Sequence, residues 1–119
     1  MKNKNDEKVS VIIRTKNEEQ FIGHVVQSVV DNLKKPEIII IDNFSEDATL
    51  DIIKNFIADP LLNNDKNSKY TKIKIFQVKD YSPGKSLNFG IRKSKFDNIM
   101  VLSAHCVIKK IDIKKIKEN

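Results

Sequence analysis

The chain has 119 residues, of which 39% are apolar and 32% are charged, with only three glycines and three prolines. This length corresponds to about one domain, and the composition excludes collagen-like, low-complexity and intrinsically disordered chains. The formal net charge is +6, but half of it lies in residues 109–119 and one unit in residues 1–8, so residues 9–108 carry too little positive charge for a nucleic-acid-binding stripe.

The first half of the chain predicts two strands separated by a helix. Residues 9–13 and 37–41 are short, almost continuously apolar runs, the pattern of parallel strands that are buried on both faces. Between them, apolar residues from Phe21 to Leu33 recur at helical spacing. Thr15 or Asn17 can cap this helix, with the glutamates that follow in its first turn.

The second half of the chain repeats this alternation. We expect a helix capped by Ser45 or Asp47 that ends near Pro60, an exposed loop at 60–71, a strand at 73–78, a turn at 82–84, a helix at 86–94 and a strand at 99–102. The residues expected to face inward from these two helices are Leu50, Ile53, Phe56 and Ile57, then Leu87 and Ile91. Because alternating strands and helices of this length form parallel sheets covered by helices, the sequence predicts an α/β fold.

In parallel sheets, ligands bind beyond the carboxyl ends of the strands. Those ends are expected at residues 15–18, 42–47, 80–85 and 103–106. The dinucleotide motif G-x-G-x-x-G is absent, and Gly84-Lys85-Ser86 lacks the first glycine of a phosphate-binding P-loop. The chemistry must therefore come from other residues at these ends.

Three polar residues at the strand ends each have two interpretations. Asp42 can project into the crevice and accept hydrogen bonds from a nucleobase or a ribose, or it can form a turn with the residues after it. His105 can ligate a metal or, when protonated, contact a diphosphate, or it can be a hydrogen-bonded structural histidine. Lys85 can neutralise phosphate or simply be solvated.

The chain has one cysteine, Cys106, which cannot form an internal disulfide. This favours a reducing, cytoplasmic compartment. The apolar run before Arg14 is shorter than the core of a secretion signal, and no segment approaches the roughly 20 apolar residues of a membrane-spanning helix. We therefore expect a cytoplasmic protein.

Four segments together resemble family 2 glycosyltransferases of the GT-A fold. They are VSVIIRTKNEEQFI at 9–22, EIIIIDNFSEDATLDII at 37–53, YSPGKSLNFGIRKS at 81–94 and NIMVLSAHC at 98–106. The resemblance implies a Rossmann-like parallel sheet with helices on both faces, the nucleotide-sugar-binding portion of such an enzyme, over residues 9–108. On this interpretation residues 1–8 form a flexible tail, the sheet stops after its fourth strand, and the basic segment 109–119 begins a severed helix.

The resemblance also implies which residues bind the nucleotide sugar. Thr15, Asn17 and Glu18 lie in the loop that wraps the nucleotide, and Asp42 matches the aspartate that contacts the base. Ser45 and Asp47 match the polar positions that follow that aspartate, Lys85 lies in the segment that lines the nucleotide in relatives, and Asn88 matches the asparagine of the family's N-x-G-I block.

Two departures from the family pattern concern the metal and the catalytic base. Ser103-Ala104-His105 replaces the D-x-D motif that holds Mg²⁺ or Mn²⁺ on the donor diphosphate. The loss of two hard oxygen ligands lowers the expected affinity for Mg²⁺ and leaves open Mn²⁺ bound by His105, or a metal-free contact between His105 and the diphosphate. No residue after Cys106 is a convincing base, and relatives supply one from a further hundred or more residues.

The sequence thus predicts the donor-binding part of a glycosyltransferase that uses a nucleoside-diphosphate sugar, with an acceptor glycan or lipid in surface polysaccharide or glycolipid synthesis. The alternative is a non-catalytic nucleotide-binding or oligomerising module. A third hypothesis assigns the basic tail to an anionic membrane or to nucleic acid, although no nucleic-acid partner is expected. An uncovered sheet edge also favours a homodimer.

Overall fold

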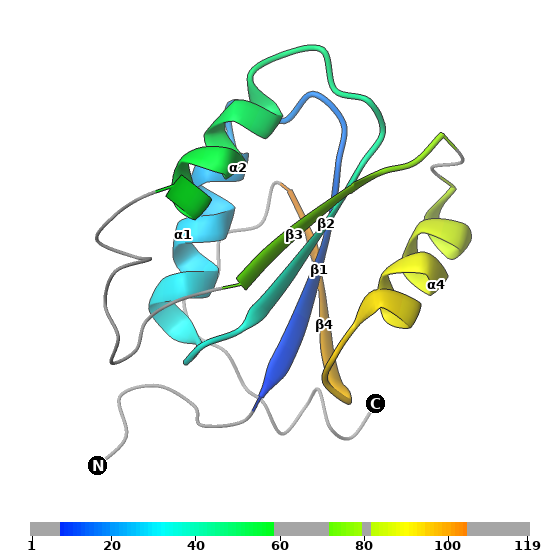
Figure 1. Ribbon diagram of the computed structural model, residues 1–119. Coiled ribbons are helices and arrows are strands. Elements are labelled where there is room, and N and C mark those ends of the chain that lie inside the picture. The colour runs from blue at the N-terminus through cyan, green and yellow to red at the C-terminus, as the bar shows by residue number, and fades with distance from the viewer. Residues whose placement is uncertain (1–7, 59–71, 80–81, 105–119) are drawn as a thin grey trace.

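The computed structural model describes residues 8–58, 72–79 and 82–104 (Figure 1). Several sequence predictions lie outside these residues: the tail at 1–7, the loop at 60–71, His105, Cys106 and the basic segment 109–119.

A four-stranded parallel sheet forms the centre of the molecule. Its order is β3-β2-β1-β4, and the strands are β1 (Val9–Thr15), β2 (Glu37–Asp42), β3 (Lys72–Gln77) and β4 (Asn98–Ser103). Since β1 and β2 occupy the middle, both of their faces are covered, which explains why their sequences are continuously apolar rather than alternating.

Helices cover both faces of this sheet (Figure 1). On one face, α1 (Ile22–Asn32) and α2 (Thr49–Ala58) pack over Val11, Ile13, Ile38 and Ile40. On the other face, α4 (Pro83–Lys93) packs over Ile12, Ile39 and Ile41. The predicted α/β architecture and element order are therefore confirmed. None of the helices in the described part of the chain has the length and apolar character needed to cross a membrane.

The start of α1 differs from the prediction. The helix begins at Ile22, its N-cap is Phe21, and no side chain caps it. Phe21, the first apolar residue of the helical spacing, is 41% exposed. Asn17, Glu18 and Glu19 bond to the loop that follows β2 and to Thr49 through backbone N–H groups and the Glu19 side chain, so their side chains do not cap α1, although the Glu18 backbone oxygen accepts the N–H groups of Phe21 and Ile22.

The other helices differ in detail. Residues 82–84 do not form a separate turn, because α4 already begins at Pro83, a residue suited to a first helical position, where no backbone N–H is needed. Two isoleucines that we expected inside, Ile57 and Ile91, are 39% and 43% exposed. In α4 the closest approach to the sheet is made by Gly90: a Cβ there would lie 2.9 Å from two atoms of Ile12.

A buried glutamate joins the elements at the amino end of the sheet. Glu37, the first residue of β2, is 2% exposed. Its carboxylate accepts hydrogen bonds from Ser10 Oγ (2.6 Å) on β1 and from the Lys95 N–H (2.7 Å) after α4, and it lies 2.8 Å from Lys74 Nζ on β3. Burial acts to raise the pKa of Glu37, but the bonds from Lys74, Ser10 and Lys95 outweigh it and hold that pKa below its usual range.

We predict that Gly90→Ala destabilises the fold by up to about 2 kcal/mol. The added methyl group overpacks the contact with Ile12 at a cost of about 1–3 kcal/mol, and the gain of about 1 kcal/mol in helix propensity offsets only part of that cost. Gly84→Ala in the same helix is the matched control, since a Cβ there meets nothing within 4 Å, and it should be neutral or stabilising. Denaturant unfolding measures both, and an equally stable Gly90→Ala variant would contradict the packing.

We also predict that Glu37 contributes to the acid sensitivity of the protein. Because its pKa is lower in the folded state, the carboxylate stabilises the fold above the pKa it has in the unfolded chain. That stability is lost as the pH falls through the folded pKa. Thermal unfolding between pH 7 and 3 should show a shallower decline for Glu37→Gln than for the wild type, whereas the control Glu46→Gln should follow the wild type. Parallel curves for all three proteins would refute this role.

Candidate functional site

A buried aspartate organises the carboxyl end of the sheet. Asp42, the last residue of β2, is 0% exposed. Its Oδ1 accepts hydrogen bonds from Thr15 Oγ1 at 2.7 Å and from Ser45 Oγ at 2.5 Å, and its Oδ2 accepts one from the Ser45 N–H at 2.8 Å. Of the two interpretations that the sequence allowed for Asp42, the structure shows the turn with the residues after it: the carboxylate bonds to Ser45 and holds the ends of β1 and β2 together.

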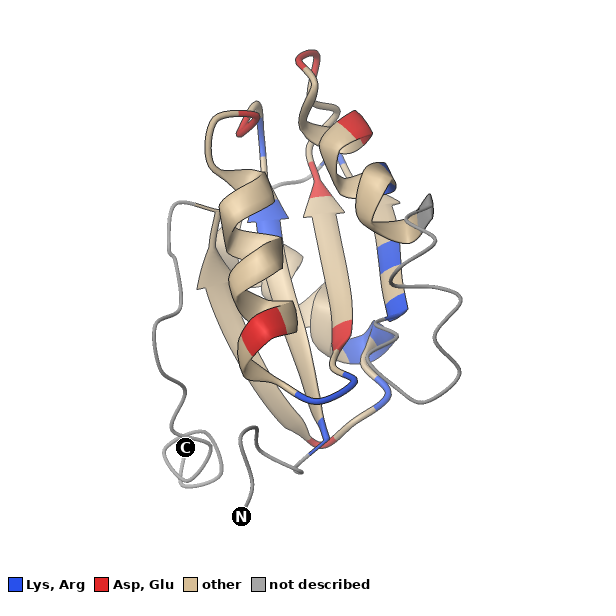
Figure 2. Ribbon diagram, turned by 90° about the vertical axis from the view of Figure 1, so that its left-hand side faces the viewer, with Lys and Arg blue, Asp and Glu red and all other residues tan. Residues whose placement is uncertain are grey.

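The loops that follow β1 and β2 bond to each other reciprocally. The Asn17 N–H donates to Ser45 Oγ, and Asn17 Oδ1 accepts from the Glu46 N–H, both at 2.8 Å. Asn17 has a positive φ of 53°, a conformation that asparagine tolerates better than most residues. The two loops thus form one unit at the carboxyl end of the sheet, where acidic residues gather (Figure 2).

Further hydrogen bonds join the loop after β1 to the residues at the start of α2. The Glu18 N–H donates to Thr49 Oγ1 at 2.7 Å, and the Glu19 N–H donates to Asp47 Oδ2 at 3.2 Å. Glu19 Oε1 in return accepts from the Ala48 N–H at 2.9 Å. Each polar side chain here satisfies a backbone group of the opposite loop or of its own turn, so the loops are held in one conformation.

Asp47 combines this positioning role with the capping of α2. It accepts hydrogen bonds from both the N–H and the hydroxyl of Thr49, the first residue of the helix. Burial acts to raise the pKa of Asp47, but the bonds from Thr49 and from the Glu19 N–H outweigh it and hold that pKa below its usual range. Asp47 is therefore ionised at neutral pH.

Two further side chains connect neighbouring strand ends. Lys16 Nζ donates to the backbone oxygen of Asn43 at 2.8 Å, joining the two loops again. Asn43 Nδ2 donates to the backbone oxygen of Val78 at 2.8 Å, just beyond β3. The ends of β1, β2 and β3 are thus fixed relative to one another.

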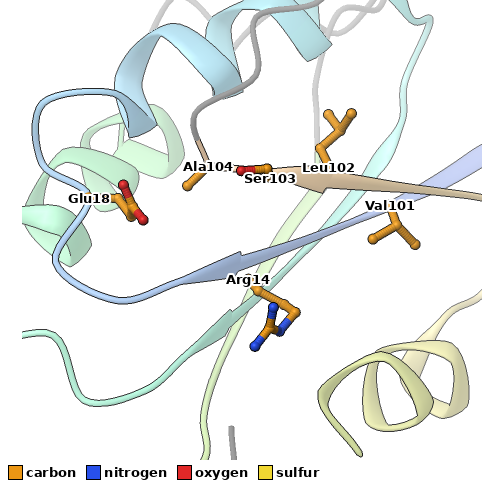
Figure 3. A pocket seen from close by; sticks show the side chains of 6 residues that line it. All are labelled: Arg14, Glu18, Val101, Leu102, Ser103 and Ala104. Atoms are coloured by element: carbon orange, nitrogen blue, oxygen red, sulfur yellow. The ribbon is translucent and has the colours of Figure 1, made fainter. Parts of the chain in front are cut away.

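A pocket of 270 Å³ lies beside this unit, next to the end of β4 (Figure 3). Its lining residues come from β1, the loop after it and the end of β4: Arg14, Glu18, Val101, Leu102, Ser103 and Ala104. Arg14 and Ser103 are register partners on adjacent strands. The pocket therefore carries one guanidinium, one carboxylate and one hydroxyl, and its other lining residues, Val101, Leu102 and Ala104, are apolar.

The structure brings together six of the site residues predicted from the sequence, places two others elsewhere on α4, and does not describe His105. Thr15, Asn17, Asp42, Ser45 and Asp47 belong to the bonded unit, and Glu18 belongs to both the unit and the pocket. Lys85 and Asn88 lie exposed on α4, and His105 is outside the described residues.

Sequence reasoning did not select Arg14 or Asn43 as site residues. The signal was present for both, because each occupies a strand end: Arg14 is the next-to-last residue of β1, and Asn43 directly follows β2.

The described residues do not fit a divalent cation of the kind that the resemblance implied. No group of three His, Cys, Asp or Glu side chains able to hold a metal occurs among residues 8–58, 72–79 and 82–104. In the pocket a single carboxylate accompanies a guanidinium, a poor environment for a hard cation, which prefers several oxygen ligands.

The fold and the position of this unit define a Rossmann-like α/β domain whose polar loops meet at the carboxyl end of a parallel sheet, the place where such domains bind ligands. The sequence profile of the family described as glycosyl transferase family 2 matches residues 10–119. The chain therefore belongs to glycosyl transferase family 2. A search of curated proteins gave no match.

Solved structures similar to this chain include the S. aureus protein TarS. One TarS structure matches with a TM-score of 0.71 and 23% identity, covering 94% of this chain and 19% of that one. TarS 1–349 in complex with UDP gives the same TM-score and identity, with 31% of that chain covered. TarS 1–349 in complex with UDP-GlcNAc gives a TM-score of 0.65 with 30% covered. The chain thus spans less than a third of the length of these proteins, and the similarity shows a shared GT-A fold.

We predict that Ser45→Ala destabilises the fold by about 1–3 kcal/mol, because it removes a donor to the buried Asp42 carboxylate and the acceptor of the Asn17 N–H. The neighbouring Glu46→Ala is the matched control, since Glu46 is exposed and bonds to Asn17 through its backbone. It should stay within about 0.5 kcal/mol of the wild type. Equal stability of the two variants in denaturant unfolding would argue against the bonded unit.

Proposed function

We propose that this chain is the donor-binding part of a glycosyltransferase. The enzyme would transfer a sugar from a nucleoside-diphosphate sugar to an acceptor hydroxyl. The observation that carries the proposal is the bonded unit of two loops beside a pocket at the carboxyl end of the sheet. Membership of glycosyl transferase family 2 supports the same reaction class.

A uridine nucleotide is the first donor class to test. Two of the similar TarS 1–349 structures are complexes with UDP and with UDP-GlcNAc. The pocket and the loops occupy the part of this fold where a nucleotide would enter, beyond the ends of β1 and β4.

We assign Asp42 a positioning role in this site. With its carboxylate buried and bonded to Thr15 and Ser45, it shapes the loops that receive the nucleotide. A direct contact between Asp42 and the base stays a prediction. We further propose that the acceptor is a surface glycan or a glycolipid. A cytoplasmic location, a homodimer and peripheral membrane association also stay proposals.

Thermal unfolding with nucleotides tests the donor site. UDP and UDP-sugars at millimolar concentration should raise the unfolding midpoint more than GDP, CDP or dTDP. A ligand at about 100 times its dissociation constant adds roughly 2.7 kcal/mol, which corresponds to several degrees in a domain of this size.

A pair of matched tyrosine substitutions, one inside the pocket and one outside it, tests whether the nucleotide binds in the pocket. Ser103→Tyr places a ring in the pocket from an exposed position and should abolish the UDP-dependent shift. Gln27→Tyr, on the exposed side of α1, adds the same ring elsewhere and should retain it. A wild-type protein that no nucleotide stabilises, or a shift that survives Ser103→Tyr, would contradict the proposed site.

A further inference from the structure

Arg14 occupies a central position at the carboxyl end of the sheet. It is the next-to-last residue of β1, where its register partners are Ile41 on β2 and Ser103 on β4. It is half-buried and lies two residues after Ile12, so it projects to the side of the sheet that α4 covers, as Figure 3 shows. A guanidinium held at this depth is a fixed positive charge, unlike a lysine on an exposed loop.

The pocket beside Arg14 is large enough for one part of a nucleotide sugar. It measures 270 Å³, close to the lower end of the range of small-molecule sites, about 300 Å³. Beside the Glu18 carboxylate it offers two groups that can donate hydrogen bonds, the Arg14 guanidinium and the Ser103 hydroxyl, and the part of such a ligand richest in acceptors is the diphosphate.

The charge of a diphosphate must be balanced wherever it binds. The described lining residues supply one positive charge, on Arg14, and a single carboxylate, on Glu18. A guanidinium binds phosphate oxygens through two parallel N–H bonds, which a point charge cannot reproduce. The Glu18 carboxylate offsets the charge of Arg14 within the described lining, so the match to a diphosphate rests on the bidentate geometry of the guanidinium, whereas a single carboxylate is a poor site for a divalent cation.

We propose that Arg14 binds the diphosphate of the donor directly and supplies, through its guanidinium, the positive charge that a divalent cation provides in metal-dependent sites. This inference rests on the proposed donor-binding function. Arg14, which lies on β1 outside the two loops, would contact the ligand directly. We therefore expect the protein to bind the diphosphate without a divalent cation.

The test compares UDP with uridine, which lacks the diphosphate, in calorimetric titrations of the full chain in EDTA and in Mn²⁺. The wild type should bind UDP more tightly than uridine in EDTA, and Mn²⁺ should change this ratio by less than about twofold. Arg14→Gln should weaken UDP binding roughly tenfold or more, as expected for hydrogen bonds to a charged group, and leave uridine binding within about twofold. Arg14→Lys should fall between the two.

Arg92→Gln is the matched control. It removes the same guanidinium from α4, where Arg92 lies 5.8 Å from the centre of the Phe89 ring, and should bind UDP as the wild type does. A UDP preference that requires Mn²⁺, or one that Arg14→Gln preserves, would overturn the inference. If Arg14→Gln does not fold, the EDTA comparison and Arg14→Lys decide. Failure of the wild type to bind any nucleotide would instead overturn the proposed function.

Discussion

The structure depends on the burial of one carboxylate, that of Asp42. A buried polar side chain is tolerated only where hydrogen bonds replace its hydration, and for Asp42 they come from Thr15 on β1 and from the side chain and backbone of Ser45. Satisfying Asp42 therefore requires that β1, β2 and the following loop adopt one arrangement. The site follows from that requirement, because Ser45, which bonds to Asp42, also accepts a hydrogen bond from the Asn17 N–H of the neighbouring loop.

Strand β2 carries a buried carboxylate at each end, and the two serve different parts of the molecule. Glu37 joins β1, β3 and the segment after α4 at the amino end, away from the loops. Asp42 joins the loops at the carboxyl end. Between them, four isoleucines face both helix layers. One strand thus anchors the framework at one end and positions the candidate site at the other, which is why its sequence combines an apolar run with acidic termini.

The sequence predicted the alternation of strands and helices and the sheet because buried parallel strands leave a strong local signal. It misjudged the cap of α1 and the burial of Ile91, and both outcomes follow from tertiary contacts: Asn17 bonds to the neighbouring loop, and Gly90 makes the close approach of α4 to Ile12. The candidate residues at strand ends could be selected, since topology places them together. The roles of these residues could not be predicted, because they depend on tertiary structure. Asp42 is buried, and Arg14 lines the pocket because β1 lies next to β4.

The central claim is that a nucleotide binds where the loops after β1 and β2 meet the end of β4. Backbone amide resonances in an NMR titration with UDP test it most directly. The account predicts chemical-shift changes concentrated at residues 14–18, 43–47 and 101–104, with little change around Glu37 at the opposite end of the sheet. Changes centred on the outer faces of α1 and α2, or around Glu37, would contradict it.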